Sequence, residues 1–316
     1  MKEAQITIFF RLLLNNLQMK KYIFLCFFLV GHLLSAHCQK EKIDKSLQKQ
    51  IENLIKGFNG EIGVYVKNLR TNKVVSINAD SIFPTASMVK IPILIGVMDK
   101  INKGELKYHQ TLTYKDSLLY AGVDILGSFK NNEQIELSKM IMLMLTMSDN
   151  TASLWLQSLA GGGKRINEIL DSIGFKNTRV NSRTPGRETN RSKFGWGQTT
   201  PYEMETLFEK IYKGKIINDS TSQKMLRLMG RDYWDEEAIS QIPSGVFVAA
   251  KNGAVDESRS ETLLVMGKKI LIYFQFVQKI IKIKAGMKTM KPGCLQESFL
   301  NYYGRNWVTD KSVVNF

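Results

Sequence analysis

The chain has 316 residues, 44% of them hydrophobic and 23% charged, a balance typical of a globular protein of one or two domains and not of a disordered chain. Its formal net charge of +15 suits an anionic cell envelope or anionic substrates. Zinc-finger spacings and recognition-helix patterns are lacking, so we expect no nucleic-acid partner. There are three histidines. Because His32 and His37 fall in a segment that we expect to be removed, a Ser-His-Asp triad would have to use His109, and a zinc site of several histidines is excluded.

Residues 1–38 are typical of a secretory signal region. A basic start is followed by a largely apolar core at 22–34, which is too short to span a bilayer. We therefore expect cleavage after Cys38, export to the periplasm and no stable membrane span afterwards, with residues 1–18 stemming from a start codon assigned too early. A lipoprotein anchor on Cys38 is the alternative. After cleavage Cys294 is the one cysteine left, so no internal disulfide can form.

Hydrophobic periodicity predicts helices between two groups of strands. Apolar residues three to four apart predict an amphipathic helix within residues 39–58, and a very apolar run predicts a buried central helix at 137–147. Pro92 predicts a bend in a helix that begins near Met88, and Thr200 caps a helix that runs to about residue 212. The five predicted strands lie at residues 61–67, 73–78, 246–250, 260–266 and 270–277.

The predicted fold class is α/β of the α+β type. Residues 39–86 and 240–316 would form a domain with a five-stranded antiparallel sheet flanked by helices. Residues 87–239 would form an all-helical domain inserted between the two groups of strands.

The first motif is S-x-x-K at Ser87 and Lys90. On a helix, positions three apart share a face, so the lysine amine can reach the serine hydroxyl, and burial would lower its pKa enough for the neutral amine to act as a base. The motif is weak alone, because Ser46 and Lys49 match it on a helix expected to be exposed. The Ser87 copy differs in being followed by an apolar, buried helix.

Two further motifs follow along the chain. Ser148-Asp149-Asn150 lies where the central helix gives way to the next one; its serine can relay a proton and its asparagine can bind a substrate amide, although a plain helix cap would have the same sequence. Lys251-Asn252-Gly253 lies on a predicted strand, where a lysine can bind a carboxylate and an edge can pair with an extended substrate. A strand that simply ends in an Asn-Gly turn is the alternative there.

The combination of S-x-x-K, S-D-N and K-T-G is the signature of class A β-lactamases and penicillin-binding proteins. Here the first two are intact and the third has one substitution, in the same order. The chain therefore resembles the class A β-lactamase-like, penicillin-recognising serine hydrolases over about residues 40–277. The single histidine outside the signal region agrees with a base other than histidine.

The resemblance implies a role for each motif residue. Ser87 would form the acyl-enzyme, Lys90 and Ser148 would move protons, and Asn150 would orient the substrate amide. The backbone N–H groups of Ser87 and Ala254 would form the oxyanion hole.

The resemblance also implies a site for the substrate carboxylate. Lys251, with Asn252 and Gly253 beside it on the strand and Arg259 on the next strand, would bind this group. Asn252 replaces the usual threonine or serine, so one hydroxyl contact is missing.

A second departure concerns deacylation. Class A β-lactamases activate the deacylating water with a glutamate followed four residues later by asparagine, on a loop before a Thr-Thr-Pro helix start. The corresponding stretch here, residues 181–201, has Glu188 as its one acid, and Asn190 follows after two residues rather than four. Glu188 is the candidate base, with a surface carboxylate as the alternative.

A third departure concerns residues 279–316, which are basic and poorly patterned where the family has a C-terminal amphipathic helix. Suitable codons for residues 279–298, read out of phase, can encode an acidic loop and helix. This leads to the hypothesis of a frameshift just after Val277, which a resequenced gene with an unaltered frame would refute.

The sequence thus predicts a monomeric serine β-lactamase that acts on a small-molecule β-lactam or peptidoglycan-type substrate without a metal or cofactor. A D-alanyl-D-alanine peptidase or another cell-wall acyl hydrolase on the same fold is one alternative. A non-catalytic penicillin-binding relic is the other.

Overall fold

The computed structural model describes residues 41–122, 124–230, 232–234, 236, 238–255, 258–267 and 271–280, the last range by its backbone alone. The chain divides into two units, Met1–Glu41 and Lys42–Phe316, and all the secondary structure described belongs to the second. The expected signal region with Cys38 and the proposed frameshifted tail beyond Ile280 lie outside the described residues. In the described part, no helix is both long enough and apolar enough to cross a membrane.

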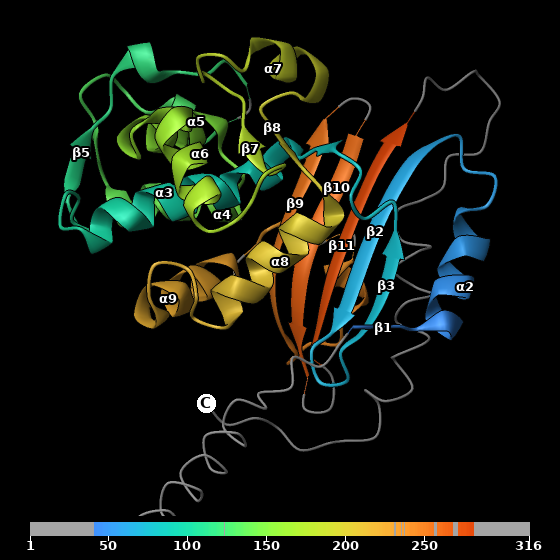
Figure 1. Cartoon of the computed structure of the whole chain (residues 1–316). Coiled ribbons are helices and arrows are strands. Elements are labelled where there is room, and N and C mark those ends of the chain that lie inside the picture. The colour runs from blue at the N-terminus through green and yellow to red at the C-terminus, as the bar shows by residue number, and fades with distance from the viewer. Residues whose placement is uncertain are drawn as a thin grey trace, which may run out of the picture. The chain divides into compact units, whose positions relative to one another are not determined.

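A mixed sheet with the strand order β1-β3-β2-β11-β10-β9 forms the centre of the second unit (Figure 1). The five predicted strands are all present, and neighbouring strands among these five run antiparallel to each other. The structure adds a sixth, β1, which runs parallel to β3 and has two residues, too few for an alternating pattern to reveal. The strands are β1 (Lys42–Ile43), β2 (Gly60–Asn68), β3 (Lys73–Ile77), β9 (Phe247–Val255), β10 (Ser258–Met266) and β11 (Leu271–Ile280).

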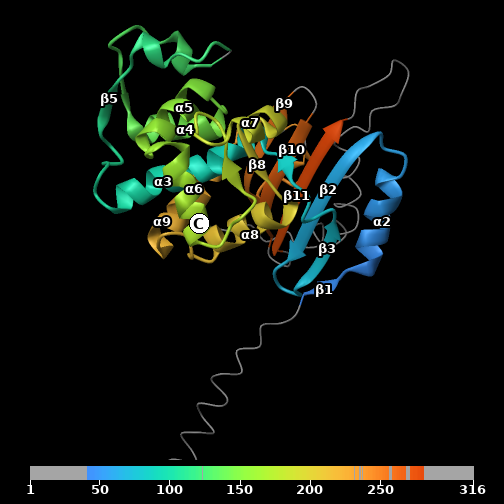
Figure 2. The ribbon, with the colours of Figure 1, turned by 45° about the horizontal axis from the view of Figure 1, so that its top comes forward.

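Eight α-helices are described, and they lie on both faces of the sheet (Figures 1 and 2). Helix α2 lies alone beside β2 and β3, whereas the helices that follow β3 lie on the other side of the sheet in both views. They are α2 (Lys45–Ile55), α3 (Lys90–Asn102), α4 (Leu137–Thr146), α5 (Asn150–Leu159), α6 (Gly162–Ser172), α7 (Glu188–Phe194), α8 (Pro201–Tyr212) and α9 (Asp219–Met229).

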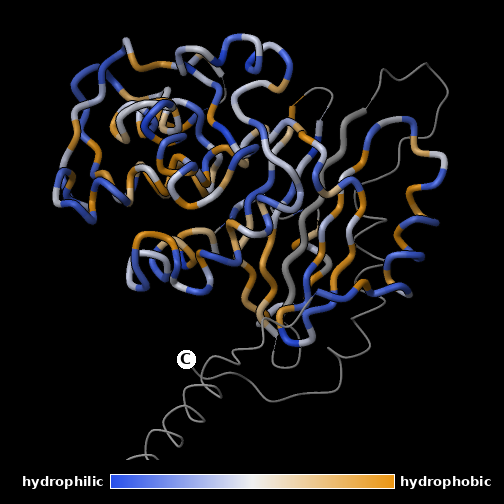
Figure 3. Tube along the Cα trace, in the orientation of Figure 1, coloured by the Kyte–Doolittle hydropathy of each residue, from blue (hydrophilic) through white to orange (hydrophobic). Residues whose placement is uncertain are grey.

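The two faces of the sheet belong to different hydrophobic clusters because successive strand residues point to opposite sides. In β10, Leu263 packs with Leu47 and Ile51 of α2, while its neighbour Leu264 packs with the helices on the other face. Hydrophobic and hydrophilic residues alternate along α2 (Figure 3), as expected of a helix that covers one face of a sheet. The larger cluster joins the sheet to the inserted helices, so both parts share one core.

Helix α3 begins with a change of helix type. A 3₁₀ turn, η1 (Ala86–Val89), leads directly into α3 at Lys90, so Pro92 falls in the first turn of the α-helix. Backbone N–H groups of a first turn have no partner within the helix, so proline costs little there. The sequence predicted a bend at Pro92; the structure accommodates the proline through this junction.

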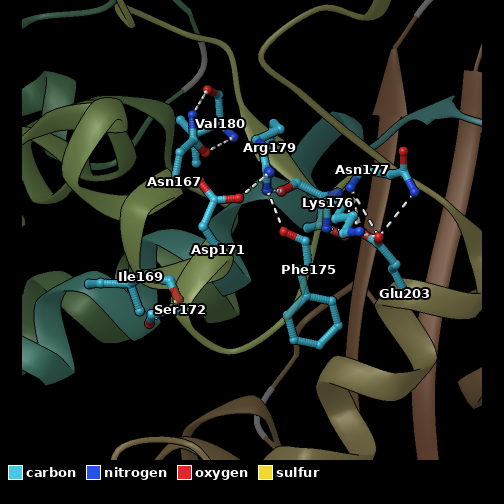
Figure 4. A network of polar contacts seen from close by, with 11 residues as sticks. Asn167, Ile169, Asp171, Ser172, Phe175, Lys176, Asn177, Arg179, Val180 and Glu203 are labelled. Carbon is cyan, nitrogen blue, oxygen red and sulfur yellow. Dashed lines mark hydrogen bonds and ion pairs between the residues drawn. The ribbon is translucent and has the colours of Figure 1, made fainter.

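Helix α8 starts as predicted, with the side chain of Thr200 accepting from the N–H of Glu203 at 3.1 Å. The Glu203 carboxylate accepts from the N–H groups of Lys176 and Asn177, each at 3.0 Å (Figure 4), and from that of Thr178 at 2.6 Å. It thereby fixes the loop that follows α6. This loop leads into β7 (Arg179–Val180) of a small sheet with the order β4-β8-β7, in which β4 is Phe83–Pro84 and β8 is Gly197–Thr199.

Candidate active site

Ser87 lies in the 3₁₀ turn η1, immediately after a strained residue. Ala86 has a φ of 44°, in the left-handed region that costs an alanine about 1–2 kcal/mol. The turn is fixed from the sheet, since Ser260 Oγ of β10 donates to the Thr85 carbonyl at 2.9 Å. Gly253 of β9 approaches so closely that an added Cβ would lie 2.8 Å from the Ser87 nitrogen. Only glycine allows β9 to lie this near the backbone of the nucleophile.

Lys90 is fully buried and its amine contacts the Ser87 hydroxyl. Nζ lies 2.9 Å from Ser87 Oγ, 2.9 Å from Ser148 Oγ and 3.0 Å from Asn150 Oδ1. The pKa of Lys90 is lowered to about 7, first because burial disfavours the charged amine and second because of the nearby Lys251 charge. At neutral pH a large fraction of Lys90 therefore has a lone pair that can take a proton from Ser87.

The junction of α4 and α5 carries Ser148 and Asn150 to Lys90. Ser148 has a φ of 60°, and its carbonyl also accepts from Lys90 Nζ at 2.5 Å. Asp149 between them is buried, and its carboxylate accepts from the N–H groups of Ala152 at 2.7 Å and Leu126 at 2.8 Å. Asp149 thus caps α5 and fixes the junction, as the helix-cap alternative expects, while Ser148 and Asn150 on either side of it contact Lys90.

Lys251 is fully buried on β9 and is paired with Asp232, an acid outside the three motifs. Its Nζ lies 3.4 Å from Asp232 Oδ2, and the side-chain exposures are 0% and 2%. Nζ also donates to Asn252 Oδ1 at 3.0 Å, so the residue that replaces threonine contacts this lysine. Burial lowers the pKa of Lys251 and raises that of Asp232, and their mutual attraction opposes both shifts.

The segment of Asp232 joins β9 to the end of α4. Trp234 Nε1 donates to the Met147 carbonyl at 3.1 Å, and Asn252 Nδ2 donates to the Trp234 carbonyl at 3.3 Å. Asp232 was missed because a lone acid in a polar segment carries no spacing that links it to a lysine nineteen residues later.

A cavity of about 380 Å³ opens beside the nucleophile. Three predicted site residues line it, namely Ser87, Asn150 and Ala254. Another part of the lining is the wall formed by residues 193–196 and Tyr120, which belong to none of the three motifs. Its volume is that of a small-molecule site, and a nucleophile next to a neutral base in such a site is suited to acyl transfer.

Comparisons with known proteins identify the family of this chain. A family model described as the beta-lactamase enzyme family matches residues 46–284. The chain belongs to this family. Beta-lactamase VEB-1 of Pseudomonas aeruginosa is 26% identical over 66% of this chain and 71% of its own length. Beta-lactamase CARB-3 of the same organism is 22% identical over 66% and 73%.

Solved structures confirm the predicted fold. The structure of PBP-A superposes with a TM-score of 0.73 at 22% identity, covering 84% of this chain and 98% of that one. A beta-lactamase from Chitinophaga pinensis gives a TM-score of 0.72 at 16% identity, covering 82% and 99%.

Glu188 and Arg259, two further predicted site residues, make no hydrogen bond or ion pair with Ser87 or Lys90 in the described part of the chain. Glu188 is exposed at the start of α7, and its Oε1 accepts from the Gly186 N–H at 3.1 Å. Arg259 donates to the carbonyls of Val255 and Ser258. Neither belongs to the described lining of the cavity.

The other candidate groups, namely His109, the second S-x-x-K copy and possible metal ligands, do not form a site in the described part of the chain. His109 is exposed and pairs with Glu136, and the second S-x-x-K copy, Ser46 and Lys49, is exposed on α2. Among the residues that the structure describes, no group of three or more histidine, cysteine or acidic side chains could hold a metal ion.

Proposed function

We propose that this beta-lactamase family member is a serine β-lactamase that opens the β-lactam amide through an acyl-enzyme on Ser87. The observation that carries the proposal is the 2.9 Å contact between Ser87 Oγ and the amine of Lys90, whose pKa is lowered to about 7, at the edge of a cavity. An activated hydroxyl of this kind is what nucleophilic catalysis requires.

Acylation follows from the contacts of Lys90. The neutral amine takes the Ser87 proton while Oγ attacks the lactam carbonyl carbon, and the N–H groups of Ser87 and Ala254 stabilise the oxyanion. The C–N bond then breaks, and the hydroxyl of Ser148 donates its proton to the departing nitrogen. Lys90, which took the proton of Ser87, passes that proton to Ser148 across their 2.9 Å contact. Lys90 ends this half-reaction neutral again.

Deacylation needs a base for the attacking water. No aspartate or glutamate lies among the described residues that line the cavity, and Glu188 faces solvent. Lys90, neutral after acylation and in contact with Ser87 Oγ, is the group that can accept the proton of this water. This assignment replaces Glu188 as the deacylating base in the proposed mechanism.

Stopped-flow nitrocefin hydrolysis tests the proposal. We expect turnover with the wild type, its loss in Ser87→Ala and in Lys90→Met, and retention in Glu188→Gln, which serves as the exposed carboxylate control. Loss of turnover in Glu188→Gln would contradict the assignment of the water to Lys90. A stoichiometric burst without turnover would contradict hydrolysis and favour the peptidase alternative.

We further propose export to the periplasm, which the signal-like pattern of residues 1–38 supports, and we propose that the exported protein is a monomer. The protein recovered from a periplasmic fraction is expected to begin at Gln39. Recovery in the membrane fraction with a lipid on Cys38 would favour the anchor instead, and sedimentation analysis of the recovered protein measures the oligomeric state.

A further inference from the structure

Lys193 is the one charged side chain among the described residues that line the cavity. It lies in the last turn of α7, and its Nζ sits 5.0 Å from the centre of the Phe194 ring. No ion pair of Lys193 with a described carboxylate is found. The amine of Lys193 is therefore available to pair with an anionic group of a ligand in the cavity.

The other cations near the site are already engaged. Lys90 Nζ contacts Ser87, Ser148 and Asn150, and Lys251 is enclosed against Asp232. Among the described residues that line the cavity, Lys193 is thus the cation whose amine a ligand can reach without displacing a hydrogen bond or an ion pair, although it also lies over the Phe194 ring.

The wall that carries Lys193 is fixed relative to the nucleophile. Gly195, with a φ of 72°, ends α7 and turns the chain, and the Trp196 carbonyl accepts from Asn181 N–H at 2.8 Å. Strand β8 follows at once, and the carbonyl of its Gly197 accepts from the N–H of Thr85 at 3.0 Å, two residues before the nucleophile. Three residues therefore separate Lys193 from a strand that is hydrogen-bonded to the turn of Ser87.

The same wall is aromatic. Tyr120 and Trp196 both line the cavity and meet edge to face, with ring centres 5.0 Å apart. Aromatic walls of this kind favour a ligand with a flat apolar group. The resemblance implies that Asn150 orients the substrate amide, and Asn150 lines the same cavity as Tyr120, Trp196 and Lys193, so an acyl side chain bound there can reach these three residues.

We infer that the site prefers β-lactams whose acyl side chain carries both an aromatic ring and a carboxylate, the ring against the Tyr120–Trp196 wall and the carboxylate paired with Lys193. This inference rests on the proposed acylation of Ser87. Lys193 is exposed, so solvent partly screens the pair, and we expect a preference of about fivefold, the size of an exposed ion pair of roughly 1 kcal/mol.

Benzylpenicillin and carbenicillin are a matched pair of probes, because they differ by one carboxylate on the carbon next to the ring. The quantity to measure is the ratio of their second-order rate constants for acylation, carbenicillin over benzylpenicillin, by acid quench and mass spectrometry. We expect this ratio to fall about fivefold in Lys193→Gln, to fall further in Lys193→Glu, and to shrink with added salt in the wild type. Lys164→Gln, at an exposed lysine of α6 outside the cavity, is the control and should keep the wild-type ratio.

The outcomes separate the two claims. An unchanged ratio in Lys193→Gln, with both penicillins still acylating Ser87, would overturn the inference and leave the proposed function standing. Absence of acylation by either penicillin in the wild type would overturn the proposed function, and the inference with it.

Discussion

Removal of the Asp232 carboxylate is expected to destabilise the protein strongly. Asp232 and Lys251 are 2% and 0% exposed and lie 3.4 Å apart, so Asp232→Asn leaves a charged amine without its partner in the interior. Breaking a buried pair in this way costs about 3–5 kcal/mol. The ability of Lys251 to lose its proton limits the penalty, since burial already lowers its pKa.

Thermal unfolding followed by circular dichroism at pH 7 measures this effect. For a domain of this size 1 kcal/mol corresponds to about 2–4 °C, so we expect Tm to fall by roughly 6–20 °C in Asp232→Asn. Glu168→Gln is the control, because its partner Arg165 is 3.7 Å away and both side chains are well exposed, so the change should stay below about 1 kcal/mol.

A double-mutant cycle separates the pair from its surroundings. Lys251→Met alone leaves the buried acid without its partner, whereas the double variant Asp232→Asn/Lys251→Met leaves no unpaired buried charge. The loss of unfolding free energy in the double variant should therefore be clearly smaller than the sum of the losses in the two single variants. Additive costs, or a single-variant cost like that of Glu168→Gln, would refute the reasoning.

Three further predictions follow from the site and its scaffold. The acylation rate should fall about tenfold per pH unit below the Lys90 pKa of about 7 and level off above it, because the neutral amine is the base; a flat profile between pH 5 and 7 would contradict this. Gly253→Ala should slow acylation about a hundredfold by displacing the Ser87 N–H, whereas Gly122→Ala, with no atom within 4 Å of the added Cβ, should match the wild type in the same assay. Glu203→Gln should cost about 2–3 kcal/mol in urea unfolding through its weakened hydrogen bonds, and a cost below 0.5 kcal/mol would be inconsistent with the network around it.

The sequence predicts the fold well where a pattern repeats. The alternation in β2 and β10 and the apolar run of α4 define the two clusters that cover the sheet. Strand β1 has two residues and no pattern, and it exists because its backbone pairs with β3. The change from the 3₁₀ turn η1 to helix α3 at Lys90 depends on tertiary packing, and the single residue Pro92 does not reveal it in the sequence.

The site is predictable where its residues are adjacent in sequence. Ser87 and Lys90 share one turn, and the structure joins them to Ser148 as expected. Asp232 and Lys193 reach the site through tertiary packing, and no spacing rule connects either one to the motifs. Their contributions therefore had to come from the structure.

Other features of the site depend on the local backbone. Glu188 was chosen by its position in a loop, but helix α7 begins there and its carboxylate binds the backbone N–H of Gly186. Glu188 is exposed at this position, and it is not among the described residues that line the cavity.

Acylation of Ser87 is the central claim, and acid quench followed by mass spectrometry tests it most directly. After brief mixing with benzylpenicillin, the wild-type protein should gain the mass of one penicillin on the peptide that contains Ser87, and Ser87→Ala should gain none. An adduct that persists in Ser87→Ala, or that maps to the peptide of Ser46, would contradict the account.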